Sequence, residues 1–265
     1  MKPQLFGFTS YFLCWAIGAV VGISTSTVCG RRAGYAAWKA AVGATVFAAA
    51  IVLGSKLLFL AEHATLPADA PLSWRGADFE AVARNGFRIP GGILLISIVL
   101  PLVARLLRAE PLRFIDAVAP GAAIATVFSR FGCFLNGCCF GRITYSFLGV
   151  SFVPHTEAYD WQVAQGLLAP TAARSLPVYP LQLGFSALSL LLFLLALRWQ
   201  RTKQFDGEVW LNFNLVFFVG TFLLELLRPY PLHLNFALCT AVVVVVAALR
   251  FIRTRGAHLS AAPAA

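Results

Sequence analysis

The segment from Ser129 to Thr144 holds the side chains best suited to chemistry in this chain. It reads Ser-Arg-Phe-Gly-Cys-Phe-Leu-Asn-Gly-Cys-Cys-Phe-Gly-Arg-Ile-Thr and places two arginines, an asparagine and three glycines in an apolar neighbourhood. An arginine at membrane depth costs about 2.5 kcal/mol or more, so it needs an anion or water. A guanidinium binds phosphate oxygens through paired hydrogen bonds, and glycines let a backbone approach a ligand closely. Arg130 is therefore predicted to bind a phospholipid phosphate; the alternative is an ion pair with an acidic side chain such as Glu225 that only holds helices together.

Glu225 and Arg228 form a second polar pair in an apolar stretch near the C-terminus. Residues spaced i, i+3 lie on one face of a helix. Taken alone, the pair is best interpreted as a local ion pair at a helix end.

The six cysteines are scattered and show no disulfide framework. Cys133, Cys138 and Cys139 raise the question of a metal, but adjacent cysteines ligate poorly together and no His or acidic residue stands at zinc-site spacing. We expect these thiols to pack as small hydrophobic groups, with no metal bound. A catalytic thiol would also lack a local base, since His155 and His233 are predicted in solvated outer loops.

Pro90-Gly91-Gly92 opens another apolar stretch. Proline is favoured in the first turn of a helix, so an ordinary helix start is one interpretation. The other is that Gly91 and Gly92 allow close helix packing or lipid access.

The rest of the chain must place these side chains in a membrane. Of 265 residues, 59 % are hydrophobic and 12 % charged, with a mean hydropathy of +0.78. Soluble domains carry about 25 % charged residues. Apolar runs near the length needed to cross a bilayer recur along the sequence, which predicts an all-α polytopic protein of about seven transmembrane helices. The predicted spans are Phe8–Cys29, Ala40–Ala61, Ile89–Leu107, Ile115–Phe134, Leu181–Leu197, Val209–Leu227 and Leu232–Leu249.

The fourth span differs from the others. Pro120 and Gly121 are expected to break it. Asp116 and Arg130 stand near its two ends, so this span is predicted to face protein or water and not lipid.

The net charge of +10 at pH 7 is typical of proteins that bind nucleic acid, but the positions of the basic residues argue against that function. Twelve of the 21 Lys and Arg residues fall in alternate loops and the tail, all on one side of the predicted membrane. By the positive-inside rule that side is cytoplasmic, the N-terminus lies outside and the C-terminus inside. We expect no nucleic-acid partner. The twelve residues are Arg31, Arg32, Lys39, Arg105, Arg108, Arg113, Arg198, Arg201, Lys203, Arg250, Arg253 and Arg255.

Two outer segments, Glu62–Arg88 and Arg142–Pro180, are long enough to form a small extracytoplasmic cap. They contain aromatic residues suited to the headgroup layer, among them Tyr159 and Tyr179. We expect one integral membrane domain over residues 1–258 and a short disordered tail over 259–265. No cleavable signal peptide is evident.

The stretch from Arg130 to Arg142 also carries a family likeness. Arg130-Phe-Gly-Cys-Phe-Leu-Asn136-Gly137, followed by Gly141-Arg142, resembles the R-x-G-N-F-x-N-G core and G-R-P-T-like ending of the bacterial phosphatidylglycerol–prolipoprotein diacylglyceryl transferase family. The likeness runs in order over about residues 5 to 250. The other matching elements are Tyr11, Gly54-Ser-Lys56, Asp116, Pro120, Val178-Tyr-Pro-Leu-Gln182-Leu, Asp206-Gly-Glu208, Gly220, Glu225 and Arg228.

The sequence departs from the family at four positions. The histidine of an H-G-G element is Pro90 here, and a sixth-helix arginine is Thr221. The first asparagine of the core is Cys133, and the histidine of an H-P-x-Q-L-Y element is Tyr179. A phosphate site is thus retained while the group that would accept a proton is missing.

The resemblance implies transfer of a diacylglyceryl group from phosphatidylglycerol to the lipobox cysteine of prolipoproteins, in the bacterial inner membrane and without a cofactor. Arg130 would clamp the leaving phosphate, and Tyr11, or Glu225 through water, would replace the missing base. The acceptor would enter as the signal peptide of a prolipoprotein. The residues that the resemblance places around the substrates are Asn136, Gly137, Gly141, Arg142, Arg228, Gly91, Gly92 and Gln182.

Two alternatives stay open at this point. One is a catalytically altered member that binds phospholipid or serves as an assembly partner, because fold alone does not fix function. The other is a related transferase that moves a lipid or phosphoglycerol group to another acceptor. A transporter is disfavoured, because no paired broken helices or inverted repeat are visible.

Overall fold

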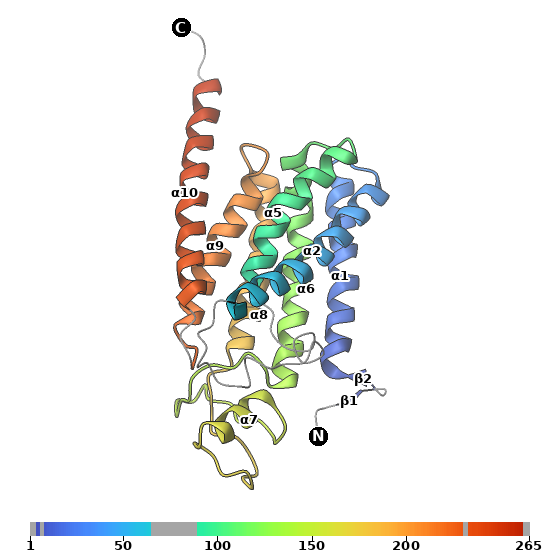
Figure 1. Cartoon of the computed structure of the whole chain (residues 1–265). Helices are drawn as coiled ribbons and strands as arrows, with labels where there is room; N and C mark the ends of the chain where they lie inside the picture. Colours follow the sequence, from blue (N-terminus) through green and yellow to red (C-terminus); the bar gives the residue numbers. More distant parts are fainter. Residues whose placement is uncertain (1–3, 6–7, 65–88, 230–232, 262–265) are drawn as a thin grey trace.

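The computed structural model describes residues 4–5, 8–64, 89–229 and 233–261. In this part of the chain, long helices run side by side as a bundle, and one short helix lies in a cap at one end (Figure 1). Two short antiparallel strands, β1 and β2, precede the first helix. The elements are β1 Gln4–Leu5, β2 Phe8–Thr9, α1 Ser10–Arg32, α2 Ala37–Ala64, α5 Ile89–Leu106, α6 Pro111–Asn136, α7 Glu157–Ala164, α8 Leu181–Thr202, α9 Glu208–Glu225 and α10 His233–Ala261.

Every predicted span corresponds to a helix, which confirms the all-α membrane fold. Six of the described helices, α1, α2, α6, α8, α9 and α10, are long and apolar enough to cross a membrane. The apolar part of α5, Pro90–Leu106, falls short of that length, so the predicted total of seven crossings stays a prediction. Residues 65–88, most of the first predicted outer segment, and 262–265, the end of the predicted tail, lie outside the described residues.

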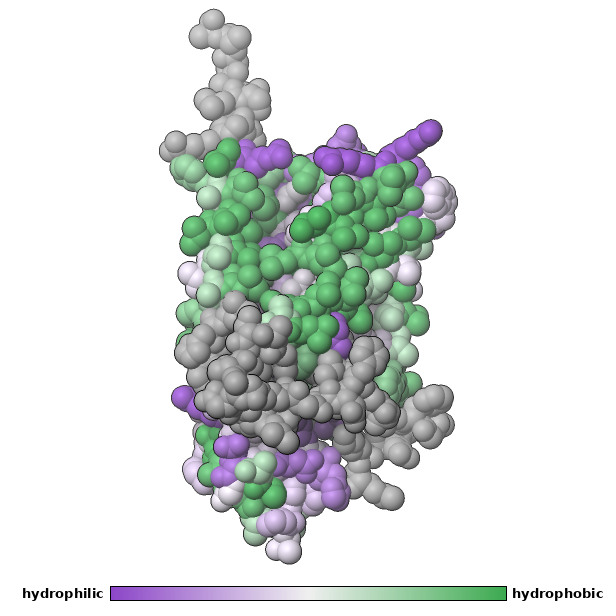
Figure 2. Space-filling view, in the orientation of Figure 1, coloured by the Kyte–Doolittle hydropathy of each residue, from purple (hydrophilic) through white to green (hydrophobic). Residues whose placement is uncertain are grey.

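The two ends of the bundle differ in character. The turns after α1, α5 and α8 and the C-terminal end of α10 lie together at one end, whereas the N-terminus and the α7 cap lie at the other (Figure 1). On the face shown in Figure 2, a hydrophobic band separates hydrophilic residues at the two ends. Nine of the twelve basic residues singled out above lie in or beside those three turns, and the other three lie in α10. Which end faces the cytoplasm stays a prediction from this charge.

Helix α6 occupies the centre of the bundle. It contacts α1, α2, α5, α8 and α9, and half of its apolar window is buried, against 11 % for α10. Small residues bring α1 and α6 close together: a Cβ on Gly22 would lie 2.8 Å from the Gly121 carbonyl oxygen. Such small-residue contacts are how helices associate where lipid removes the hydrophobic driving force.

The expected break in α6 at Pro120 was wrong, because the helix continues from Pro111 to Asn136. Proline removes the hydrogen bond to the carbonyl four residues earlier, which here is that of Asp116. The Gln200 side-chain amide donates to this Asp116 carbonyl at 3.0 Å. A side chain of α8 therefore replaces the lost backbone bond, and the helix need not end.

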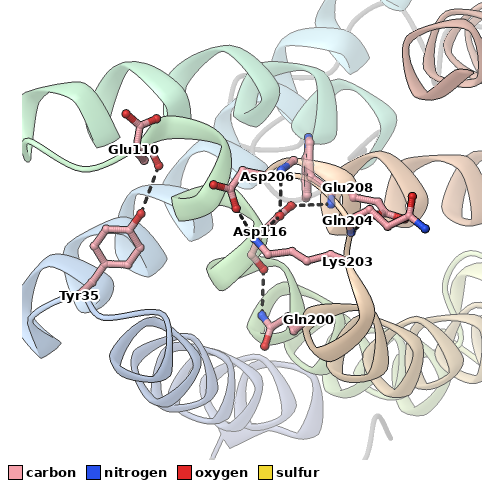
Figure 3. A network of polar contacts seen from close by, with 10 residues as sticks. Tyr35, Glu110, Asp116, Gln200, Lys203, Gln204, Asp206 and Glu208 are labelled. Carbon is pink, nitrogen blue, oxygen red and sulfur yellow. Dashed lines mark hydrogen bonds and ion pairs between the residues drawn. The ribbon is translucent and has the colours of Figure 1, made fainter. Parts of the chain in front are cut away.

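Asp116 joins α6 to the turn between α8 and α9 (Figure 3). Its buried carboxylate accepts hydrogen bonds from Lys203 Nζ at 3.1 Å and from the backbone N–H groups of Gly207 at 2.9 Å and Trp210 at 3.0 Å. Lys203 also pairs with Asp206 at 2.5 Å. Desolvation opposes the charge of Lys203, but its bonds to Asp206 and Asp116 outweigh this effect and raise the pKa of its ammonium group. Asp116 thus faces protein, as its place in the fourth span predicted.

The cap has a small core of its own. The Tyr159 hydroxyl donates to the carbonyls of Pro170 at 2.7 Å and Ala172 at 2.9 Å, and its ring is buried. The Tyr159 hydroxyl is thus used inside the cap, and a place for this residue in the headgroup layer stays a prediction. The Ala158 N–H donates to the Gly137 carbonyl at 3.2 Å, which fixes the cap to the end of α6.

Candidate active site

The candidate site lies at the cap end of α6, where the helix stops. Gly137 takes a left-handed conformation with φ 69°, and its N–H donates to the Phe134 carbonyl at 3.1 Å. The Cys138 N–H donates to the Cys133 carbonyl at 3.2 Å. These two bonds form a Schellman motif, the usual way in which a glycine ends a helix. The motif turns residues 138–142 back toward the bundle.

Arg130 is buried in this part of α6, with 9 % of its surface exposed. Its guanidinium carbon lies 4.7 Å from the ring centroid of Phe185 on α8, and its Nε has no hydrogen-bond partner. Among the described residues no carboxylate pairs with it. The predicted alternative, an ion pair between Arg130 and Glu225, is therefore not what the structure shows. A buried cation without a protein anion is suited to bind one from outside the chain.

Glu225 pairs with Arg228, as the local interpretation predicted. Arg228 Nε lies 3.2 Å from both carboxylate oxygens, and the two side chains are 5 % and 8 % exposed. One detail of the prediction was wrong: α9 ends at Glu225, so Arg228 lies in the turn beyond the helix and not on its face. The Glu225 carboxylate is thus paired with Arg228 and not with Arg130.

Gly141 and Arg142 hold this turn against two other segments. The Gly141 N–H donates to the Tyr179 carbonyl at 2.9 Å, and the Arg142 N–H donates to the Leu227 carbonyl at 2.7 Å. The Arg142 side chain is exposed, and its guanidinium carbon lies 6.0 Å from the Tyr179 ring centroid. The structure therefore brings the predicted residues of the core motif beside the turn that carries Arg228.

Substituting Gly141→Ala should destabilise the protein by about 1–3 kcal/mol, the usual range for overpacking. The new Cβ would lie 2.9 Å from the carbonyl oxygens of both Leu227 and Tyr179, and backbone atoms cannot move aside as a side chain can. Denaturant unfolding in detergent would measure the free energy. Gly184→Ala is the matched control, because its Cβ would meet only the flexible end of Leu224. Equal losses in the two variants would contradict this account of Gly141.

Gln182 and Tyr11 reach the same turn from α8 and α1. Gln182 is fully buried; its Nε2 donates to the Cys138 carbonyl at 2.6 Å, and its Oε1 has no partner. A Cβ on Gly132 would lie 3.3 Å from the Tyr11 carbonyl oxygen, which places the start of α1 against this part of α6. Tyr11 is within electrostatic range of the thiols of residues 133, 138 and 139. Asn136, the last residue of α6, makes no side-chain hydrogen bond within the described structure.

Gly91 and Gly92 have a packing role. The three atoms nearest to a Cβ on either glycine all belong to α2, and for Gly92 the nearest is the Ile51 carbonyl oxygen at 2.7 Å. Gly54 of α2 is the neighbour of Gly91, so the Gly54-Ser-Lys56 and Pro90-Gly91-Gly92 elements meet. Of the two interpretations offered by the sequence, close helix packing is the one that the structure supports.

Cys133, Cys138 and Cys139 come together, which their spacing did not predict. Their sulfur atoms all lie within 4.8 Å of one another. The side chains of adjacent residues usually point in different directions. Cys139 has a left-handed backbone with φ 59°, and its sulfur lies close to those of Cys133 and Cys138. Two features of the site had no warning in the sequence: this convergence and the stacking of Phe185 on Arg130. The first depends on the turn that ends α6 and on the left-handed backbone of Cys139, and the second on the packing of α8 against α6.

The family model described as prolipoprotein diacylglyceryl transferase matches residues 4–254. The chain belongs to the prolipoprotein diacylglyceryl transferase family. A phosphatidylglycerol–prolipoprotein diacylglyceryl transferase 2 of Clostridium perfringens is 29 % identical over 233 residues, covering 86 % of this chain and 82 % of the relative. A phosphatidylglycerol–prolipoprotein diacylglyceryl transferase of Clostridium tetani is 29 % identical, covering 68 % of this chain and 64 % of the relative. One of Tropheryma whipplei is 25 % identical, covering 74 % of this chain and 70 % of the relative.

Membership of the prolipoprotein diacylglyceryl transferase family makes the chain one of a group of lipid-group transferases. In the described structure, the residues of the family's central motif gather in one place, at the cap end of α6. The two predicted glycines of α5 lie instead in the α2–α5 contact.

Proposed function

We propose that this protein transfers the diacylglyceryl group of phosphatidylglycerol to the lipobox cysteine of a prolipoprotein, in the bacterial inner membrane. The observation that carries the proposal is Arg130: a buried guanidinium, stacked on Phe185, with no carboxylate partner among the described residues. The phosphate of the lipid supplies the missing negative charge. The names of the relatives support the choice of donor and acceptor.

The reaction makes two demands on the site. The acceptor thiolate attacks the glyceryl carbon next to the phosphate ester, a C–S bond forms, and the C–O bond breaks with its electron pair passing to glycerol phosphate. A cation must stabilise that leaving group, and Arg130 is placed to do so. The exposed Arg142 and the amide of Asn136 orient the headgroup from the turn beyond α6. Gly137 and Gly141 keep the turn close to the bundle.

The thiol must also lose its proton. Tyr11 lies at the site and stays a candidate base. Glu225 is a weaker candidate, because its carboxylate is held by Arg228. That pair serves instead to position a second guanidinium at the same end of the bundle.

The test incubates the purified protein with phosphatidylglycerol and a peptide that carries a lipobox cysteine. We expect release of glycerol phosphate together with a gain in peptide mass equal to the diacylglyceryl group. Saturable binding of phosphatidylglycerol with neither product would contradict transfer and indicate a lipid-binding protein. Glycerol phosphate release without peptide modification would contradict the proposed acceptor.

A further inference from the structure

The three converging thiols at the end of α6 form a site that packing alone does not explain. Small hydrophobic groups can fill a core without meeting at one point, yet these sulfur atoms lie within 4.8 Å of one another. Cys139 adopts a left-handed conformation that residues other than glycine seldom take. Strained positions of this kind persist where the surrounding structure holds them and cluster at functional sites.

Two buried polar groups beside the thiols lack partners. Gln182 Oε1 is unpaired while Nε2 of the same side chain fixes the Cys138 carbonyl. Arg130 Nε is also unpaired, and its charge acts on both Cys133 and Cys139. A divalent cation bound by three thiolates carries a net charge of about −1. The positive charge of Arg130 would favour such an anionic group nearby, and the guanidinium, which has no carboxylate partner among the described residues, would still be available to the phosphate.

We propose that Cys133, Cys138 and Cys139 bind one Zn²⁺ ion and leave its fourth coordination position for the acceptor thiol. Thiolates are preferred ligands of Zn²⁺, and sites with three protein ligands keep a position open for water or substrate. No fourth His, Cys, Asp or Glu joins the cluster in the described part of the chain. Cys138 and Cys139 are only half-buried, so the cluster is not sealed inside the bundle.

The ion would solve the problem of the missing base. His155, the histidine whose side chain the structure describes, is exposed on the cap and does not join the three thiols. A thiol that coordinates a metal ion is deprotonated, and the thiolate is the nucleophile. The acceptor thiol gives its proton to solvent as it binds Zn²⁺. Its sulfur then attacks the glyceryl carbon, and the breaking C–O bond leaves its electrons on the phosphate held by Arg130. This role of the ion rests on the proposed function, whereas binding of the ion does not.

The first test measures the metal content of the full-length protein purified in detergent without chelators. We expect about one zinc ion per chain, and its loss in Cys133→Ser, Cys138→Ser and Cys139→Ser. Cys29→Ser and Cys239→Ser are matched controls, because both replace buried cysteines outside the cluster and should keep the ion. Cys133→His retains a zinc ligand and should recover binding, which separates loss of a ligand from loss of the fold.

Co²⁺ replacement gives a second readout. Thiolate-to-cobalt charge-transfer absorption is expected in the wild type and in Cys29→Ser, and is expected to be absent from the serine variants of the cluster. Two results overturn the site: zinc retained equally by the cluster variants, or a metal-free protein in which two of the three thiols are joined by a disulfide that a reductant opens.

The last experiment separates the ion from the reaction. Protein stripped of zinc should bind phosphatidylglycerol as before but release glycerol phosphate at least 100-fold more slowly, and added Zn²⁺ should restore the rate. Equal rates with and without zinc would overturn the role in acceptor activation. Zinc bound at the cluster with no transfer in any form would overturn the proposed function and leave the metal site standing.

Discussion

Arg130→Ala is expected to slow release of glycerol phosphate by about 100- to 1,000-fold, the range found when one group that stabilises a developing negative charge is removed. The guanidinium is buried and aligned by Phe185, so no reorganisation is needed when charge develops on the leaving phosphate. Alanine also removes the cation that attracts the headgroup, so saturable binding of phosphatidylglycerol should weaken. Both effects are measured with the same purified protein in detergent.

Arg130→Lys separates charge from geometry. Lysine keeps a positive charge but presents a point charge in place of a planar fork, and it cannot stack on Phe185 in the same way. We expect this variant to bind phosphatidylglycerol with little loss and to transfer at an intermediate rate. Arg198→Ala is the matched control, because Arg198 is an exposed arginine near the opposite end of α8 and should leave both measurements unchanged. Unchanged headgroup binding in Arg130→Ala would remove Arg130 from the proposed function.

The fold was predictable because lipid imposes a simple rule on sequence. A segment that crosses a bilayer must be long, apolar and helical, so hydropathy alone located all seven apolar helices. The end of α10 was missed, because this helix continues to Ala261, well beyond the predicted end at Leu249. The cap was predictable only as a long loop, and its internal bonds, such as those of Tyr159, were not. Short polar segments carry no comparable periodic signal.

Two of the errors arose because a simple local rule was overridden, in one case by a partner distant in sequence and in the other by the turn that ends a helix. Pro120 removes a hydrogen bond inside α6, but Gln200, 80 residues later, satisfies the carbonyl that is left. Cys138 and Cys139 are poorly placed neighbours in a regular backbone, but the turn that ends α6 reorients them toward Cys133. Local propensities describe the isolated segment, and tertiary contacts decide between its possible conformations.

The sequence alone identified Arg130 as a candidate site residue, because burying a charge has a cost that does not depend on the fold. A charge in an apolar segment is costly wherever the helix packs, so its presence predicts a function before any contact is known. Choosing between a lipid phosphate and Glu225 as its partner required the fold. The structure pairs Glu225 with Arg228 across the end of α9, which leaves the lipid phosphate as the partner that we propose for Arg130.

Asp116→Ala is expected to destabilise the protein by about 3–5 kcal/mol, the usual consequence of removing one partner of a buried ion pair. The carboxylate accepts hydrogen bonds from Lys203 and from the N–H groups of Gly207 and Trp210 (Figure 3). Without it, two buried backbone donors at the start of α9 lose their acceptor, and the ammonium group keeps only Asp206. Unfolding in mixed micelles with increasing denaturant would measure the loss.

Asp206→Asn is the matched control for that variant. Asp206 is the exposed partner of the same lysine, with 48 % of its side chain accessible, so its removal should cost no more than about 1 kcal/mol. Asp116 and Arg130 lie 14 residues apart on one helix, or about 21 Å along its axis. Asp116→Asn, which preserves one oxygen acceptor, should therefore lower stability while the folded fraction retains its affinity for phosphatidylglycerol. Equal stability of the Asp116 and Asp206 variants would show that this buried network does not hold α8 and α9 to the central helix.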